Sequence, residues 1–253
     1  MDFLKLIRVE LIKSKRARMF PLLFIAPLLV VISGVANLSM YLTPEYTNAW
    51  AAMFIQSALL YAYYLLPFSM LAVCLMLTGR ETQNGGLTKM LSLPVRRPAL
   101  ALGKFCVLAL FLLLEMAVFL SAFVLAGLFA LRGAQITQTV PTAYLLKCCL
   151  GLFLSMLPCM AVMWAITAAF EKPLISLGLN LFLVLPGVLA AATPFWMLYP
   201  YCYSGYLISL SLHSFTAQGG ETALSLFPFL PCAVLFFISG LGLAAARYGR
   251  EKV

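Results

Sequence analysis

The segment GRETQNGGLTKMLSLPVRRPALALGK, from Gly79 to Lys104, is the longest polar interruption in a sequence of which 64% is hydrophobic. Long apolar runs flank it on both sides, and its only acidic residue is Glu81. Its five basic residues are Arg80, Lys89, Arg96, Arg97 and Lys104. Because basic loops between membrane spans are typically cytoplasmic, we predict that this segment is a cytoplasmic loop on which a soluble partner docks.

The composition indicates an integral membrane protein, since only 10% of the residues are charged and the mean hydropathy is +1.02. A soluble domain of 253 residues could not bury this much apolar surface. The apolar runs are continuous rather than alternating, which predicts an all-α fold with helical spans. The net charge of +9 does not indicate nucleic-acid binding, because the basic residues gather at the ends of apolar runs, where they orient spans and contact anionic lipid.

We predict one transmembrane domain over residues 1–253, with six helical spans preceded by an amphipathic helix at residues 1–18. This first helix places Phe3, Leu6 and Leu11 on one arc and basic residues on the other, as helices lying in the membrane interface do. With both termini cytoplasmic, the inner segments carry 15 of the 17 lysines and arginines. The spans are predicted at residues 19–42, 52–77, 105–131, 147–170, 174–192 and 223–246, with an outer segment at 193–222.

Within the loop, residues 81–93 predict a short helix with Leu87, Met90 and Leu91 on one face, which needs lipid or a protein partner to cover it. The loop contains, in order, Glu81, Asn84-Gly85, Leu87, Leu91-Ser92-Leu93-Pro94, Arg96-Arg97 and Lys104. This pattern resembles the segment between the second and third spans of ABC-2 type permeases. In length and topology the chain is most similar to permease subunits of bacterial lantibiotic immunity transporters, the MutE/EpiE/SpaE-like group.

The resemblance implies that the loop carries a coupling helix that docks on an ATP-hydrolysing subunit, and that the turn between the fourth and fifth spans makes a second, smaller contact. It also implies two copies of an ABC ATPase, a second permease subunit that is identical or a related sister chain, and a multi-pass location in the bacterial plasma membrane. The chain lacks a Walker motif, so we expect ATP and Mg²⁺ on the partner ATPase and no cofactor, metal or catalytic residue on this chain. The implied coupling residues are Glu81, Asn84, Gly85, Leu87, Met90, Leu91, Arg96, Arg97, Glu171 and Lys172.

Two further features are candidates for the path of the cargo, which the resemblance implies to be a lantibiotic-like amphipathic peptide expelled from the membrane. Glu115 lies about midway along the third span, where an ionisable group usually faces a cavity or a polar partner. It is either a contact for a cationic peptide or a coupling site, or else a hydrogen-bonded glutamate that joins helices through Asn180, Gln56 or a serine. The aromatic residues of the outer segment form either a lid and recognition surface or an interfacial belt. The candidate pathway residues are Glu115, Asn180, Trp196, Tyr199 and Tyr203.

Three other functions stay open from the sequence. One is an ABC-2 exporter with a different amphipathic cargo, such as a drug or a lipid. Another is a proton-coupled secondary transporter with Glu115 as the proton site, although the sequence shows no convincing inverted repeat. The last is a non-transporting scaffold, which would need the loop only for docking.

Overall fold

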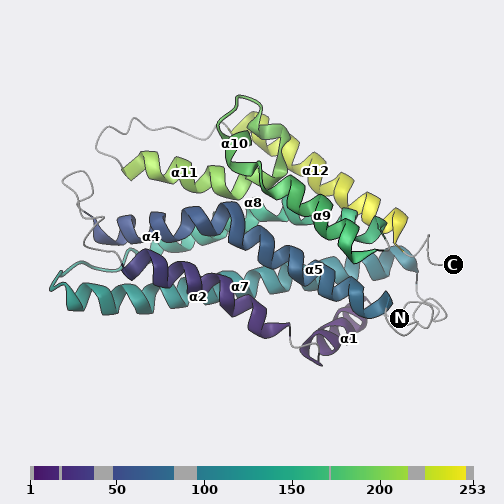
Figure 1. Cartoon of the computed structure of the whole chain (residues 1–253), viewed down its shortest axis with the longest axis horizontal. Helices are drawn as coiled ribbons and strands as arrows, with labels where there is room; N and C mark the ends of the chain where they lie inside the picture. The colour runs from purple at the N-terminus through teal and green to yellow at the C-terminus, as the bar shows by residue number, and fades with distance from the viewer. Residues whose placement is uncertain are drawn as a thin grey trace.

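The computed structural model describes residues 3–16, 19–36, 48–82, 96–170, 172–215 and 226–248, and every regular element within them is a helix. Most of the helices run along one common axis, and the first helix turns aside at one end (Figure 1). The elements are α1 (Phe3–Arg16), α2 (Phe20–Ala36), α4 (Ala49–Leu60), the π-helical turn η1 (Tyr61–Leu65), α5 (Leu66–Thr82), α7 (Arg97–Gly133), α8 (Thr142–Ala169), α9 (Pro173–Val184), α10 (Gly187–Ala191), the 3-10 turns η3 (Trp196–Leu198) and η4 (Pro200–Cys202), α11 (Tyr203–Phe215) and α12 (Leu226–Arg247).

Five helical stretches in the described residues are long and apolar enough to cross a membrane, and a sixth is obtained if the bent pair α1 and α2 counts as one broken span. The helix axes of that pair differ in direction by 71°. This confirms the all-helical, multi-pass class. The five stretches are Ala49–Gly79, Arg97–Gly133, Thr142–Ala169, Pro173–Ala191 and Pro228–Arg247.

Local sequence explains where these helices begin. The side chain of Asn48 caps α4, since its Oδ1 accepts hydrogen bonds from the backbone N–H groups of Trp50 and Ala51. Proline stands in the first turn of α7 and of α9, where its missing N–H and fixed φ suit a helix start. As a result α7 begins at Arg97, eight residues before the predicted span, and reaches 37 residues.

The bundle is built on close helix pairs, with α2 against α7 and α8 against α12. Gly240 of α12 sits directly on α8, because a Cβ at this position would lie 2.8 Å from the backbone carbon of Ala161. Small residues allow such backbone approach in membranes, where helices gain little from the hydrophobic effect. Close packing of complementary surfaces therefore stabilises the α8–α12 pair.

Candidate coupling and transport sites

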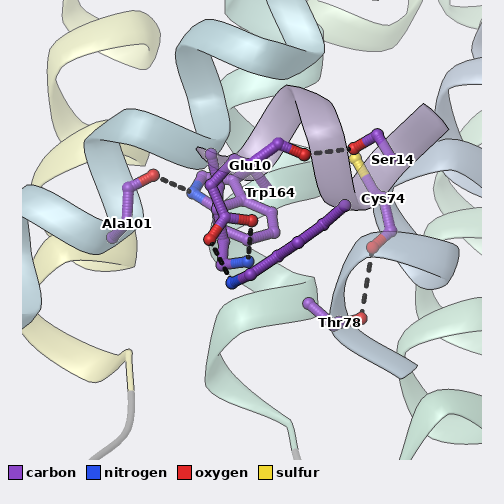
Figure 2. A network of polar contacts seen from close by, with 8 residues as sticks. Glu10, Ser14, Cys74, Thr78, Ala101 and Trp164 are labelled. Carbon is purple, nitrogen blue, oxygen red and sulfur yellow. Dashed lines mark hydrogen bonds and ion pairs between the residues drawn. The ribbon is translucent and has the colours of Figure 1, made fainter. Parts of the chain in front are cut away.

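Glu10 and Lys104 form a buried ion pair that joins α1 to α7. Lys104 Nζ lies 2.9 Å from Glu10 Oε2, and Lys13 Nζ lies 2.7 Å from Glu10 Oε1. The side chains of Glu10 and Lys104 are 3% and 1% exposed, whereas that of Lys13 is 42% exposed. Figure 2 shows Glu10 between α1 and the neighbouring helices, with Ser14 beside it. The two helices also approach closely at Gly103, where a Cβ would lie 2.0 Å from Leu6 Cδ2.

Burial alone would raise the pKa of Glu10, but the charges of Lys104 and Lys13 and the hydrogen bonds from them outweigh burial. The pKa of Glu10 is therefore lowered from its ordinary value of 4.5. The carboxylate stays ionised at neutral pH, and both charges of the buried pair are compensated.

This lowered pKa predicts a loss of stability in acid. Since the pKa of Glu10 is lower in the folded than in the unfolded chain, its contribution is complete above the unfolded pKa and is lost as the pH falls through the folded pKa. We expect the unfolding temperature of the detergent-purified protein to fall as the pH is lowered from about 5 to about 3. The fall should be smaller in Glu10→Gln, and equal falls in the two proteins would contradict this role for Glu10.

Trp164 ties α8 to the same region. Its Nε1 donates a hydrogen bond to the backbone oxygen of Ala101, 3.2 Å away on α7, and its ring lies 6.0 Å from that of Tyr248, just after α12. Cys74 and Thr78 of α5 are drawn in the same view, toward the side of Ser14 (Figure 2). We call Glu10, Lys104, Ala101 and Trp164 the base cluster. It joins α1, α7 and α8 at the end of the bundle where α5 and α7 lead into residues 83–95.

The structure describes only part of the predicted coupling set. Arg96 and Arg97 are exposed at the start of α7, and Lys172 is exposed at the N-cap of α9. Glu81 belongs to the last turn of α5. The residues outside the described part of the chain are Asn84, Gly85, Leu87, Met90, Leu91 and Glu171.

The base cluster changes one expectation and adds a residue that sequence reasoning missed. Lys104 was expected to be a basic residue of the loop, but it lies inside α7 and is buried against Glu10. Glu10 was not singled out at all. The sequence does contain a feature that could have identified Glu10. Glu10 lies four residues after Leu6 and therefore falls on the apolar arc of the amphipathic helix. An acid on that arc needs a buried cation as a partner.

Glu115 is fully buried and joins α7 to the second predicted span, which contains the π-helical turn η1. Ser69 Oγ lies 2.7 and 2.9 Å from its two carboxyl oxygens, and the hydroxyl of Tyr61 donates to Oε1 at 3.1 Å. Tyr61 opens the π-helical turn η1, and Ser69 lies in the first turns of α5 that follow it. Turns of this type inside α-helices are often found at functional sites. The serine expected as a partner of Glu115 is thus Ser69.

Asn180 belongs to a different network. Its Nδ2 donates to the backbone oxygen of Ser176 at 2.9 Å, and its Oδ1 accepts from the hydroxyl of Tyr201 at 2.8 Å. Gln56, the other expected partner of Glu115, is exposed. The structure therefore does not bring Asn180 and Glu115 together.

Glu115→Gln tests the role of this carboxyl group. An amide can still accept the hydrogen bonds from Tyr61 and Ser69, so we expect a change in stability of less than about 1 kcal/mol and nearly unchanged ATP-driven transport. Glu115→Leu leaves the hydroxyl of Tyr61 without this acceptor and should destabilise the protein by about 1–3 kcal/mol. A complete loss of transport in a well-folded Glu115→Gln variant would instead indicate a proton-coupled carrier.

Aromatic residues of the predicted outer segment form a packed cluster with Phe229 of α12. Trp196 stacks on Tyr206 and Phe229, with ring centroids 3.9 and 5.5 Å apart, and Tyr203 contacts the Phe229 ring edge-on at 4.9 Å. Trp196 and Tyr203 are buried, while Tyr199 is half-buried and donates a hydrogen bond to the backbone oxygen of Leu183. A role of these rings in recognition would require the cluster to open.

The fold and these sites define a multi-pass helical membrane protein with a carboxyl group buried in its helix bundle and a polar stretch of sequence between α5 and α7. The profile of the ABC-2 family transporter proteins matches residues 6–187, from α1 to the first residue of α10. The chain therefore belongs to the ABC-2 family of transporter proteins. No curated protein and no solved structure matches it. Membership makes the chain a membrane permease of an ABC transporter and implies a separate ABC ATPase as its partner.

Proposed function

We propose that this chain is the permease subunit of an ATP-driven exporter in a bacterial plasma membrane, and that the exporter expels lantibiotic-like antimicrobial peptides. The family match together with the position of the basic loop supports the permease part of the proposal, whereas the peptide cargo rests on the sequence resemblance to lantibiotic immunity permeases. The loop joins α5 to an α7 whose first eight residues precede the predicted span. A force on the loop would therefore act directly on two long helices.

In the proposed cycle, two permease chains, identical or sister chains, stand on two copies of the ATPase. ATP and Mg²⁺ bind to the ATPase, and closure of the ATPase dimer displaces residues 79–104. The buried Glu10–Lys104 pair makes α1 follow the start of α7. Glu171 and Lys172, before α9, supply the second contact. The permease then switches between two states with different access to the cargo.

The alternative of a proton-coupled carrier gains no support from Glu115. A carrier needs its carboxyl group to exchange protons with water, whereas the Glu115 side chain has no exposed surface and is held by two hydroxyl groups. A drug or a lipid as the cargo of the same ABC exporter is an outcome that transport assays can distinguish from a peptide.

The docking part of the proposal is tested by co-purification with the ABC ATPase encoded beside this chain. We expect Leu87→Asp combined with Leu91→Asp to weaken capture of the ATPase at least about tenfold, because two charges would replace the apolar face that is buried on docking. Thr88→Asp combined with Ser92→Asp is the matched control, since these polar positions lie outside the apolar face of the predicted helix. Equal capture by both double variants would contradict a coupling helix here.

The cargo is tested in cells and in vesicles. Co-expression of this chain with its ATPase should raise the concentration of a lantibiotic such as nisin that a sensitive strain tolerates. Purified transporter in proteoliposomes should release membrane-bound peptide only with ATP and Mg²⁺. ATP-dependent extrusion of a lipid or a dye, with no effect on the peptide, would replace the peptide as cargo and leave the permease assignment intact.

A further inference from the structure

A groove runs between the C-terminal parts of α8 and α12. Its volume is about 570 Å³. One wall consists of apolar α8 residues between Val162 and Ala169. The other consists of α12 residues between Phe236 and Leu243, of which Ser239 is polar. Phe170 and Arg247 line its C-terminal end.

Backbone contact between α8 and α12 fixes the distance between the two walls. Gly240 lies against Ala161 and lines the groove, so the shape of the groove follows from the closest approach of the two helices. Phe170 is 41% exposed and Leu243 is 59% exposed, so both rims remain accessible from outside the bundle. A groove with apolar walls between two membrane spans suits a hydrocarbon chain.

The charge at one end indicates which molecule fits. Arg247 is exposed at the end of α12, and the sequence continues with Arg250, Glu251 and Lys252, so the basic residues of this end outnumber the one acid. Guanidinium groups bind phosphate oxygens in a bidentate manner. The charge distribution predicts that this end of the helices is cytoplasmic, where the membrane leaflet carries anionic lipids and basic pockets between spans bind their headgroups.

We propose that the groove binds an anionic phospholipid of the cytoplasmic leaflet, with one acyl chain between α8 and α12 and its phosphate at Arg247. A cationic peptide would place its own positive charge against Arg247. A second copy of the chain docked by the same face around a two-fold axis would bring two Arg247 side chains to the same end of the interface. Both of these occupants fit the charge less well than an anionic lipid.

The groove also lies close in sequence to the predicted second contact with the ATPase. Phe170 is followed directly by Glu171 and Lys172, the predicted second contact with the ATPase. A lipid in the groove would thus lie at the helix end that leads into that contact. This consequence rests on the proposed function, whereas lipid binding itself does not.

The binding is tested on the whole chain in nanodiscs without the ATPase. The probes are phosphatidylglycerol and phosphatidylcholine that carry the same photoreactive group on an acyl chain, and labelled residues are identified by mass spectrometry. We expect phosphatidylglycerol to label the walls of the groove about fivefold more than phosphatidylcholine, since one basic residue at the membrane surface contributes about 1 kcal/mol. Equal labelling by the two lipids would overturn the proposal.

Variants separate the headgroup from the acyl chain. Arg247→Gln should reduce phosphatidylglycerol labelling to the level of phosphatidylcholine, and Arg247→Lys should retain most of it. Ala169→Trp should block labelling by both probes because the indole fills the groove. The matched controls are Arg8→Gln, an exposed arginine on α1, and Ala246→Trp, an exposed position of α12 that does not line the groove.

Three further results would overturn the proposal. They are labelling that does not respond to Arg247→Gln, labelling that survives Ala169→Trp in a folded protein, and cross-links between two copies of the chain across the groove. Elution profiles in size-exclusion chromatography and unfolding temperatures show which variants fold. If Ala169→Trp does not fold, Arg247→Gln and Arg247→Lys still test whether the groove binds an anionic lipid. Since the ATPase is absent, failure here leaves the exporter proposal untouched, and loss of ATPase capture leaves the lipid site untouched.

Discussion

Lys104→Met is expected to destabilise the folded chain by about 3–5 kcal/mol, because it leaves the carboxylate of Glu10 buried without its main partner. The Lys104 side chain is 1% exposed and that of Glu10 is 3% exposed, so water cannot take the place of the lost ammonium group without opening the contact between α1 and α7. The free energy of unfolding in detergent, measured at neutral pH, gives the size of the effect. The variant should also unfold at a lower temperature.

Two control variants distinguish the effect of breaking the buried ion pair from the effect of removing a lysine. Lys13→Met removes the other lysine that contacts Glu10, but its side chain is 42% exposed, so we expect a change below about 1 kcal/mol. The double variant Glu10→Leu with Lys104→Met removes both buried charges and should recover most of the stability. The interpretation fails if Lys13→Met and Lys104→Met cost the same, or if the double variant is as unstable as Lys104→Met.

The second large effect is expected for Gly240→Leu, which should destabilise the protein by about 3 kcal/mol. A Cβ at this position would lie 2.8 and 2.9 Å from the backbone carbon and oxygen of Ala161. Backbone atoms within a packed helix cannot turn away as the end of a side chain can, so α8 and α12 would have to separate. Thermal unfolding in detergent measures this cost.

Gly242 provides the matched control on the same helix. A Cβ there would meet no heavy atom within 4 Å, so Gly242→Leu adds the same side chain without forcing α12 from α8. Leucine has a higher helix propensity than glycine, and we expect no loss of stability. Similar losses from Gly240→Leu and Gly242→Leu would show that the close contact with Ala161 does not explain the effect.

Hydrophobic run length and charge patterning predict the helical membrane class well, because they depend on local composition. The stretch Ala49–Gly79 extends the predicted span of residues 52–77 by only a few residues at each end. Hydropathy alone places the start of the third span at residue 105, whereas α7 begins at Arg97, where the proline at position 98 marks a helix start. Hydropathy indicates where a chain meets lipid, but not where its helix ends.

Contacts between distant segments explain what the sequence could not predict. Glu10 and Lys104 are 94 positions apart, and no periodicity within either segment indicates that they pair. For Glu115 a serine partner could be expected in kind, but the choice of Ser69 depends on how α5 packs against α7 after the turn η1. The burial of Trp196 and Tyr203 likewise depends on Phe229, which α12 brings back from a later part of the chain.

The length of α7 has a mechanical consequence. At about 1.5 Å per residue, its 37 residues measure about 55 Å, whereas the hydrocarbon core of a bilayer is about 30 Å thick. Glu115, tethered to Ser69 and Tyr61, stands at the midpoint of this helix. If α7 turns as a rigid body about this contact, a displacement at Arg97 appears at Gly133 with about the same size and the opposite direction, because the two halves of the helix are equally long. The movement of α7 at Gly133 would then be no larger than the movement that the loop transmits to Arg97.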